Sequence, residues 1–450
     1  MDPVFDVIVV GAGFSGLNAA RILRSQGKNV LVLEARDRVG GRTKQGQIAG
    51  LDIDLGGMWL APSQNRLVSL ADIVGCTTYP TFLEGKSVVS MAGKSGLVAG
   101  ENFTEIFTFH EKIQIQWFYK KINTLLSRID PSSPWQGELA RKLDSMSVEV
   151  WLLKAVNSER LRALIRGVCT SFFCAETTQV SLLFFLVYVK NSGGLELMTS
   201  AAAGGGQNLL FYGGVHQIAR DIAKCLGSAV RVNEPVYSVD VTQDVAVVGA
   251  RSGHYRAKNI IIAIPSNLID KIQFIPNLPN AQAALHARVS MGSVIKFWVA
   301  YSTPFWRERG LNGSILRDDR MVSPCFDVSP PNQKIGLIAG FFEGDHAVFV
   351  GELAAGKRRD LVLDTLAEHF GKLALDPLEY IDVDWTKEEW SKGGYGTFAP
   401  PGVMSHYGSW LQKPHQTVHW AGTETATQWP GYIEGALQAG ERAAYEILNM

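Results

Sequence analysis

The feature that most constrains the fold is a glycine-rich turn between a predicted strand and a predicted helix near the start of the chain. Residues 6–10, DVIVV, are apolar after the first residue, which is typical of a buried strand in a parallel sheet. Residues 16–26 predict a helix, and residues 29–35, NVLVLEA, predict a second strand. This order predicts a right-handed βαβ unit, the building block of a Rossmann-like, doubly wound sheet.

The turn itself, GAGFSG, has the spacing GxGxxG through Gly11, Gly13 and Gly16. Gly11 permits a tight turn, Gly13 lets the backbone approach a pyrophosphate, and Gly16 lets the helix pack closely on the strand. The helix N-terminus then stabilises phosphate charge. Glu34 ends the second strand, where a carboxylate can bind ribose hydroxyls rather than a 2′-phosphate. Each feature alone has an ordinary explanation, but together they predict a dinucleotide site.

A loop with two glycines and three arginines follows Glu34 and includes Ala35, Arg36, Gly41 and Arg42. Its glycines let the backbone approach phosphate oxygens, and guanidinium groups bind such oxygens in pairs. By itself this loop could be a basic surface loop.

Composition limits the classes of protein to consider. A chain of 450 residues is longer than one hydrophobic core usually accommodates, so its length predicts two domains. Charge is balanced, 43 basic against 43 acidic residues, so neither nucleic acid nor an anionic membrane is an expected partner. Five scattered cysteines, outside any Cys/His cluster, predict no metal site and a reducing compartment, cytoplasmic or another. We expect no membrane span, signal peptide or tail anchor in this chain.

The order of strand and helix patterns predicts an α/β fold combined with an α+β fold. Residues 104–189 are rich in helical patterns, whereas strand patterns return in the middle and near the end of the chain. We therefore expect a discontinuous dinucleotide-binding domain formed by residues 1–80, 205–290 and 385–450. A second domain of mixed sheet and helices would comprise residues 81–204 and 291–384.

Three motifs, in this order along the chain, resemble those of the flavin amine oxidase family, and within it the monoamine oxidases. They are GAGFSG with LEARDRVGGRT, then LDIDLGGMWLAPSQNR, and finally HWAGTETATQWPGYIEGA. The resemblance implies FAD as cofactor and a small-molecule amine and O₂ as substrates. The implied reaction converts the amine, O₂ and water to an aldehyde or ketone, ammonia and hydrogen peroxide.

The resemblance also implies which residues contact the cofactor. These are Gly11, Gly13, Ser15, Gly16, Glu34, Ala35, Arg36, Gly41, Arg42, Gly57, Met58, Trp59, Val236, Trp385, Gly422, Thr423 and Glu424. Family members that bind FAD covalently have a cysteine directly before the first of two tyrosines near the flavin. Here that residue is Gly394, which has no nucleophile, so we expect non-covalent FAD.

Three residues are implied at the reacting centre. Lys296 lies within an apolar strand pattern, where it could equally lie on the exposed face of an edge strand. The family's lysine holds a water against the flavin, and burial would lower the pKa of its amine. Tyr395 and Tyr432 resemble the two aromatic residues that frame the flavin, although each could be an ordinary core tyrosine.

The predicted substrate pocket is apolar apart from one amide, with ordinary core packing as the alternative for each residue. Its members are Phe172, Phe173, Cys174, Met198, Gln207, Leu210, Phe341 and Trp429. No charged residue occurs at Trp59-Leu60-Ala61, where relatives that bind amino acids or polyamines recruit their substrate, so an apolar monoamine is favoured.

Two alternatives to a monoamine oxidase stay open. A polyamine, nicotine-type or L-amino acid oxidase would share most of these motifs. A binding protein of the same fold, similar to GDP-dissociation inhibitors, would lack redox activity. The sequence also leaves open whether two copies associate as a homodimer.

Overall fold

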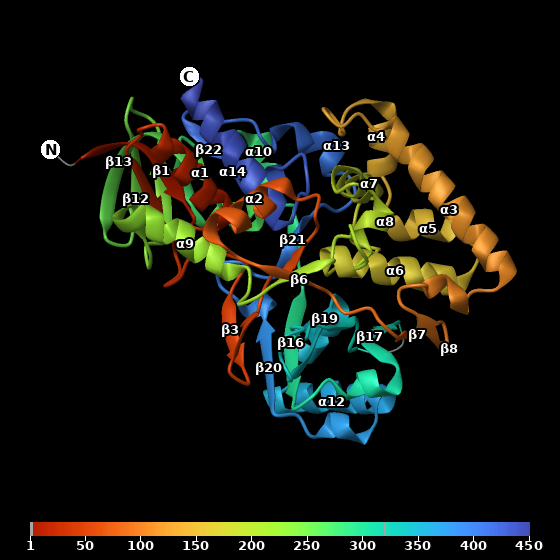
Figure 1. Cartoon of the computed structure of the whole chain (residues 1–450). Coiled ribbons are helices and arrows are strands. Elements are labelled where there is room, and N and C mark those ends of the chain that lie inside the picture. Colours follow the sequence, from red (N-terminus) through yellow and green to blue (C-terminus); the bar gives the residue numbers. More distant parts are fainter. Residues whose placement is uncertain (1–2, 319–320) are drawn as a thin grey trace.

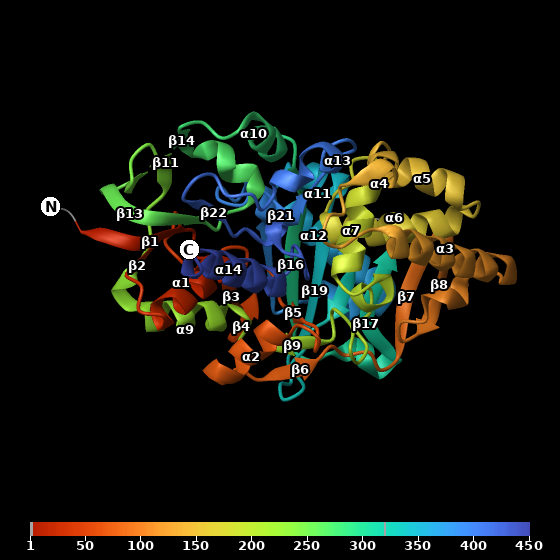
Figure 2. The same cartoon turned by 90° about the horizontal axis from the view of Figure 1, so that it is seen from above.

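The computed structural model describes residues 3–318 and 321–450. Two large sheets and a group of helices form the molecule (Figures 1 and 2). The N- and C-terminal segments lie together on the first sheet, and the helices contributed by residues 109–198 lie at the opposite end of the molecule in Figure 1.

The first sheet has eight strands in the described part of the chain, in the order β10-β2-β1-β13-β12-β11-β14, with β22 paired to β13. The predicted βαβ unit is present as β1, α1 and β2, and the predicted Rossmann-like fold class is confirmed. Helix α1 begins two residues before the predicted position, directly after Gly13. The strands are β1 (Val4–Val10), β2 (Val30–Leu33), β10 (Val230–Arg231), β11 (Val236–Asp240), β12 (Ala246–Ala250), β13 (Gly253–Ile262), β14 (Gln273–Ile275) and β22 (Val418–Trp420).

Four parallel strands of this sheet end at the same edge. Val10 of β1 pairs with Leu33 of β2 and with Ile262 of β13, and Ile262 pairs in turn with Trp420 of β22. The segments that follow these strands therefore meet at this carboxyl edge, which is where ligands bind in open α/β sheets.

Helices cover the first sheet and pack tightly on one another. They are α1 (Phe14–Ser25), α2 (Asn65–Val74), α9 (His216–Leu226), α10 (Asn280–His286) and α14 (Ile433–Leu448). The packing of α1 on α14 requires Gly440, because a Cβ atom there would lie 2.1 Å from the carbonyl oxygen of Ser15. This contact joins the two ends of the sequence (Figure 2).

The second sheet has seven strands in the described residues, in the order β20-β16-β19-β18-β17-β7-β8. The strands are β7 (Lys86–Met91), β8 (Lys94–Ala99), β16 (Val294–Tyr301), β17 (Leu311–Arg317), β18 (Cys325–Asp327), β19 (Gly336–Glu343) and β20 (Glu379–Asp384). Helices α11 (Asp345–Gly351) and α12 (Ala355–Phe370) accompany it, and α12 lies beneath it in Figure 1.

The faces of β16 differ, because successive side chains of a strand point to opposite sides. Ile295, Phe297 and Val299 join the apolar cluster that contains the side chains of α12. Val294 and Trp298 join a different cluster, on the side of the first sheet. Lys296 lies between Val294 and Trp298 at every second position of the strand, so its side chain points to the same side as theirs, towards the carboxyl edge.

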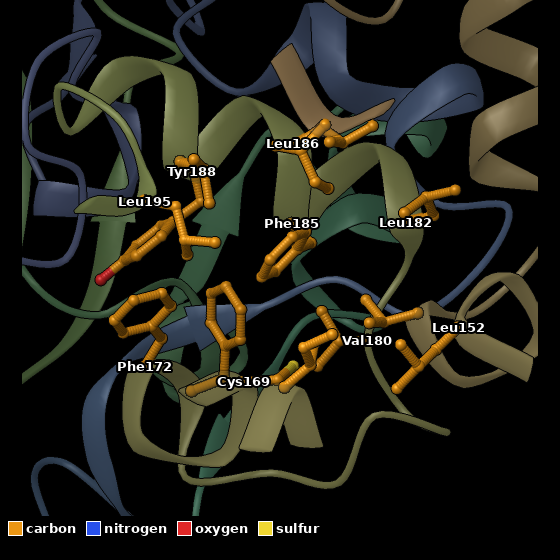
Figure 3. Close-up of a cluster of buried hydrophobic side chains, with 14 of the residues drawn as sticks. Leu152, Cys169, Phe172, Val180, Leu182, Phe185, Leu186, Tyr188 and Leu195 are labelled. Atoms are coloured by element: carbon orange, nitrogen blue, oxygen red, sulfur yellow. The ribbon is translucent and has the colours of Figure 1, made fainter. Parts of the chain in front are cut away.

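The helical group is formed by α3 (Phe109–Arg128), α4 (Gly137–Asp144), α5 (Val148–Ala155), α6 (Glu159–Phe173), α7 (Leu182–Asn191) and α8 (Leu195–Met198). Its core is a continuous apolar cluster. Figure 3 shows Leu152 at one end of this cluster and Phe172 and Tyr188 at the other. None of the helices within residues 3–318 and 321–450 is long and apolar enough to cross a membrane.

Short sheets connect the large units. They are β3 (Gln45–Ile48) with β4 (Leu51–Asp54), β5 (Trp59–Leu60) with β9 (Leu209–Phe211) and β6 (Thr78–Pro80), and β15 (Ser290–Gly292) with β21 (Gly394–Phe398). All strands of the first large sheet come from residues 1–80, 205–290 and 385–450, and all strands of the second come from residues 81–204 and 291–384. That these segments are separate folding domains stays a prediction.

Candidate active site

A single cavity runs from the carboxyl edge of the first sheet to the second sheet. It brings most of the predicted site residues together. Those on its wall are Gly11, Gly13, Ser15, Glu34, Ala35, Arg36, Gly41, Arg42, Gly57, Met58, Trp59, Val236, Trp385, Gly422 and Thr423 at the predicted cofactor positions, and Phe172, Gln207, Lys296, Phe341, Tyr395 and Tyr432 at the predicted amine end.

The glycine-rich turn is held in place by Glu34. One carboxylate oxygen accepts a hydrogen bond from the backbone N–H of Ala12 at 2.7 Å, and the other accepts one from the backbone N–H of Arg36 at 3.0 Å. Gly11 has φ +100°, and a Cβ atom on Gly16 would lie 1.9 Å from the carbonyl oxygen of Gly11. The turn thus needs these glycines for its own geometry as well as for a ligand.

The arginine-containing loop makes contacts that the sequence motif did not predict. The guanidinium of Arg36 binds Glu388, with Nε 2.9 Å from the carboxylate. Arg38 donates from one nitrogen to the carbonyl oxygens of Val39, Gly41 and Thr43, and so supports the loop from behind. Arg38 occurs in the motif, but its role depends on the folded loop.

Arg42 links the two ends of the cavity. It donates to the carbonyl oxygen of Tyr395 at 2.8 Å and to Glu424 at 3.1 Å. Ser15, in the first turn of α1, bonds the carbonyl oxygen of Ala421 in the segment after β22. These bonds join the first turn of α1 and the loop to segments near the C-terminus.

The residues of the cavity fit a dinucleotide cofactor that carries an additional ring with polar groups. Among the described residues, Glu424 Oε2 and Trp59 Nε1 are buried polar atoms without a hydrogen-bond partner. Buried polar atoms normally have partners, so Trp59 Nε1, which belongs to a residue on the cavity wall, is suited to an acceptor group of a ligand. Helix α14 begins after Tyr432 without a side-chain cap, and its N-terminus favours negative charge.

Lys296 is buried, with 3% of its surface exposed, and its amine points at the last residue of β4 and the segment that follows. Nζ lies 2.7 Å from the carbonyl oxygen of Asp54, 2.8 Å from that of Gly56 and 3.0 Å from Met58 Sδ. The alternative of an exposed lysine on an edge strand is therefore excluded. Burial lowers the pKa of Lys296, although the negative charge of Asp54 acts in the opposite direction.

Asp54 is a site-adjacent acid that the sequence analysis missed. Its carboxylate accepts from the backbone N–H of Val215 at 2.9 Å, just before α9, and its backbone carbonyl accepts from Lys296 and Trp298. Burial raises the pKa of Asp54, and the charge of Lys296 counteracts this. The only sequence signal was its position two residues before Gly56-Gly57.

Tyr395 and Tyr432 come from segments that touch each other. A Cβ atom on Gly396 would lie 3.1 Å from the Cα atom of Gly431, so glycine at both positions permits this close approach. Tyr395 meets Phe341 edge to face at 5.9 Å between ring centroids. Tyr432 packs against Trp429 at 4.8 Å. Each ring is thus fixed by another aromatic residue, and both face the same cavity.

The far wall of the cavity is largely aromatic. Trp59 lies 5.0 Å from Phe326 and 6.1 Å from Phe341, measured between ring centroids. Phe172 and Tyr188, from the helical group, also line the cavity. Sequence reasoning missed Ser171, Tyr188, Phe326 and Glu343, of which only Glu343 gave a signal, as a charged residue at the end of an apolar strand pattern.

Several predicted residues lie behind the wall instead of on it. Phe173 and Met198 belong to the apolar core of the helical group, and Cys174 and Leu210 to the cluster between the two sheets. Trp429 supports Tyr432 from behind, Gly16 packs on Gly11, and Glu424 contacts the cavity region through Arg42 and Gly422.

Comparisons with known proteins give the family. A model described as flavin-containing amine oxidoreductase matches residues 14–448. A probable flavin-containing monoamine oxidase A of Dictyostelium discoideum is 34% identical over 99% of this chain and 98% of its own. Human flavin-containing amine oxidase B is 37% identical over 99% of this chain and 86% of its own.

Solved structures agree. Putrescine oxidase bound to putrescine superposes with a TM-score of 0.95 at 31% identity, covering 100% of both chains. Cyclohexylamine oxidase from Brevibacterium oxydans IH-35A gives a TM-score of 0.94 at 32% identity, covering 99% of both chains.

The fold and these comparisons define a flavoprotein oxidoreductase. More specifically, the chain belongs to the flavin-containing amine oxidase family, whose members oxidise small-molecule amines with O₂. Its cofactor is FAD. Gly394 has no side chain that could form a covalent bond, and the flavin is held by non-covalent contacts.

Proposed function

We propose that the protein oxidises an apolar primary monoamine at the aromatic end of the cavity. The observation that carries this proposal is the joining of the glycine-rich turn, Lys296, Tyr395 and Tyr432 in one cavity. The wall formed by Trp59, Phe326 and Phe341 supports an apolar substrate body, because it offers contact area and few groups for a second charge.

Tyr395 and Tyr432 would hold the amine nitrogen between their rings. Aromatic rings attract a cationic nitrogen through their negative faces. They also exclude water and orient the substrate's α-carbon towards the cofactor. When bound, FAD accepts the two electrons that leave the amine, and O₂ takes them up afterwards.

Lys296 would exchange protons at the cofactor end. Its Nζ is fixed by two carbonyl oxygens and a sulfur, and burial favours the neutral amine. A neutral amine can donate its two N–H groups to the two carbonyl oxygens and keep its lone pair to accept a hydrogen bond from water. This supports the role implied by the family resemblance, a lysine that holds a water.

Cofactor contacts follow the cavity wall. We assign Gly11, Gly13 and Ser15 to the pyrophosphate, and Glu34 to the ribose hydroxyls. The region of Gly57, Met58 and Trp59 would lie beside the flavin ring, and Val236 beside the adenine. Glu424 lies behind the wall and would hold Arg42, which donates to it, at the ribityl and phosphate end of the cofactor.

The compartment is also a proposal. All five cysteines are unpaired in the structure, and three of them are buried. Unpaired cysteines are most compatible with a reducing compartment inside the cell. Fractionation of the source cells, with detection of this chain, would test this.

The experiment that tests the proposed function is anaerobic bleaching of the flavin by a panel of amines. We expect benzylamine and other apolar primary amines to bleach it fastest, with diamines and amino acids slower. Preferential bleaching by putrescine, spermidine or an L-amino acid would replace the monoamine with that substrate class. A purified protein without a flavin spectrum, which stays colourless after addition of FAD, would contradict the proposal altogether.

A further inference from the structure

Glu343 is an acidic residue on the cavity wall to which the proposed function assigns no role. It is the last residue of β19, has 7% of its surface exposed and lines the cavity. Side chains of a strand alternate between its faces, so Glu343 shares its face with Phe341, which packs on Tyr395. The backbone therefore directs this carboxylate at the amine end of the cavity.

Two hydroxyl groups hold the carboxylate in a fixed position. Tyr395 donates from its hydroxyl to Oε1 at 2.9 Å, and Ser171 donates to Oε2 at 3.0 Å. Ser171 also lines the cavity, on the last turn of α6. The carboxylate is thus bonded directly to one of the two tyrosines assigned to the amine.

Glu343 has no cationic partner among residues 3–318 and 321–450. No Lys, Arg or His of the described residues forms an ion pair with it, and Lys296 on the neighbouring strand β16 bonds Asp54 and Gly56 instead. The titratable groups that face it are Tyr395 on β21, Cys174 at the end of α6 and Glu176 in the following loop. A buried carboxylate without a counterion is costly unless a cation reaches it.

Burial, together with the negative charge of Glu176, raises the pKa of Glu343 to about 8, although the bonds from Tyr395 and Ser171 act in the opposite direction. The group therefore gains its charge in the pH range in which amines are protonated. A phenol that donates to a carboxylate also has a more electron-rich ring, and such a ring attracts a cation more strongly.

We propose that Glu343 is a specificity-determining residue, whose carboxylate makes the Tyr395 side of the cavity prefer a ligand with positive charge at nitrogen over a neutral ligand of the same shape. The inference rests on the proposed function, since it takes Tyr395 as the binding site of the amine. Glu343 acts on the reacting nitrogen, and no second amine on the substrate is required.

Two non-oxidised ligands of equal shape test this inference. Benzyltrimethylammonium carries a permanent charge, and neopentylbenzene is its neutral isostere, so neither ligand titrates. Their dissociation constants for the holoenzyme are measured from the change in the flavin spectrum between pH 6 and pH 9. The ratio of the two constants reports the preference for charge, independently of packing.

In the wild type, we expect the preference for the cation to rise as pH increases through about 8, because Glu343 then becomes ionised. Glu343→Gln should weaken binding of the cation about tenfold at pH 9, leave the neutral ligand unchanged and abolish the pH dependence. Ser171→Ala should move the midpoint to higher pH, since it removes one bond to the carboxylate. Glu352→Gln, an equal loss of charge at an exposed position, should behave as the wild type.

Equal weakening of both ligands in Glu343→Gln would show that the residue only supports packing, and would overturn the inference. An unchanged ratio would overturn it as well. The proposed function fails separately, because it depends on bleaching by amines and not on the ratio of these two inhibitors.

Discussion

The two ends of the cavity are built in different ways. The dinucleotide end is made mainly by a short stretch of sequence, residues 10–42, and by backbone groups at a sheet edge. The proposed amine end collects side chains from five separate parts of the chain, namely Phe172, Lys296, Phe341, Tyr395 and Tyr432. The first is therefore recognisable from local spacing, whereas the second depends on buried side chains that the tertiary structure brings together.

The largest expected effect concerns the flavin as a whole. Because Gly394 offers no nucleophile, acid or heat denaturation should release all of the FAD into the supernatant. Absorbance of the supernatant and the pellet after centrifugation measures this. Yellow colour that stays with the precipitated protein would show a covalent bond to another residue. The cofactor would then also be held by a side chain, and the two ends of the cavity would no longer differ in this respect.

Lys296→Met tests the amine end. Removal of the buried amine should lower flavin reduction or its reoxidation by O₂ at least about 100-fold, the usual scale for a lost proton-transfer group. Stopped-flow absorbance separates the two steps. Lys258→Met, at an exposed position paired with Asp6, is the matched control and should leave both rates unchanged. Unchanged rates in Lys296→Met would refute the role proposed for this lysine.

The pH dependence of turnover also tests the proposed amine end of the cavity. The amine must lose its proton before a hydride can leave the α-carbon. We therefore expect kcat/KM to rise with pH, about tenfold per unit, up to the pKa of the free amine. Initial rates of peroxide formation between pH 6 and pH 9 measure this. A flat profile over that range would contradict oxidation of the neutral amine.

Gly16→Ala tests the dinucleotide end. A Cβ atom there would lie 1.9 Å from the Gly11 carbonyl oxygen, so the turn must move. Overpacking of this kind costs about 1–3 kcal/mol, and we expect a clear loss of bound FAD per protein. The ratio of flavin absorbance to protein absorbance in the purified sample reports the occupancy. Gly167→Ala, in α6 with open space around it, should keep full occupancy.

The smallest effect is on stability. The pKa of Glu343 is raised by folding, so its favourable contribution is present below the pKa of the unfolded chain and is lost as pH rises through about 8. Glu343→Gln removes this loss. Its Tm should therefore exceed that of the wild type by about 3 °C at pH 8.5, and by less at pH 5. A difference in Tm that does not vary with pH would contradict an ionising Glu343 in the folded protein.

The sequence by itself determined the elements whose signal is local. The strand, glycine turn and helix of residues 4–25 were predicted to within two residues, because the spacing of Gly11, Gly13 and Gly16 is itself the physical requirement of the turn. The motifs after Glu34 and around Gly422 likewise lie on the cavity wall, since both directly follow strands that end at one sheet edge.

The tertiary structure decided which side chains face the cavity. Phe172 lines it and its neighbour Phe173 does not, a difference of helix rotation that sequence cannot show. The sequence left open whether Lys296 is exposed or buried. In the structure its strand is paired with β19 on one side and β20 on the other, and the lysine is buried. The place of Glu343 on the cavity wall followed from the parity of β19 and from the two hydroxyl donors that bond its carboxylate. The properties of these side chains depend on their burial and on the pairing of strands that are far apart in the sequence. Neither can be read from the local spacing of residues.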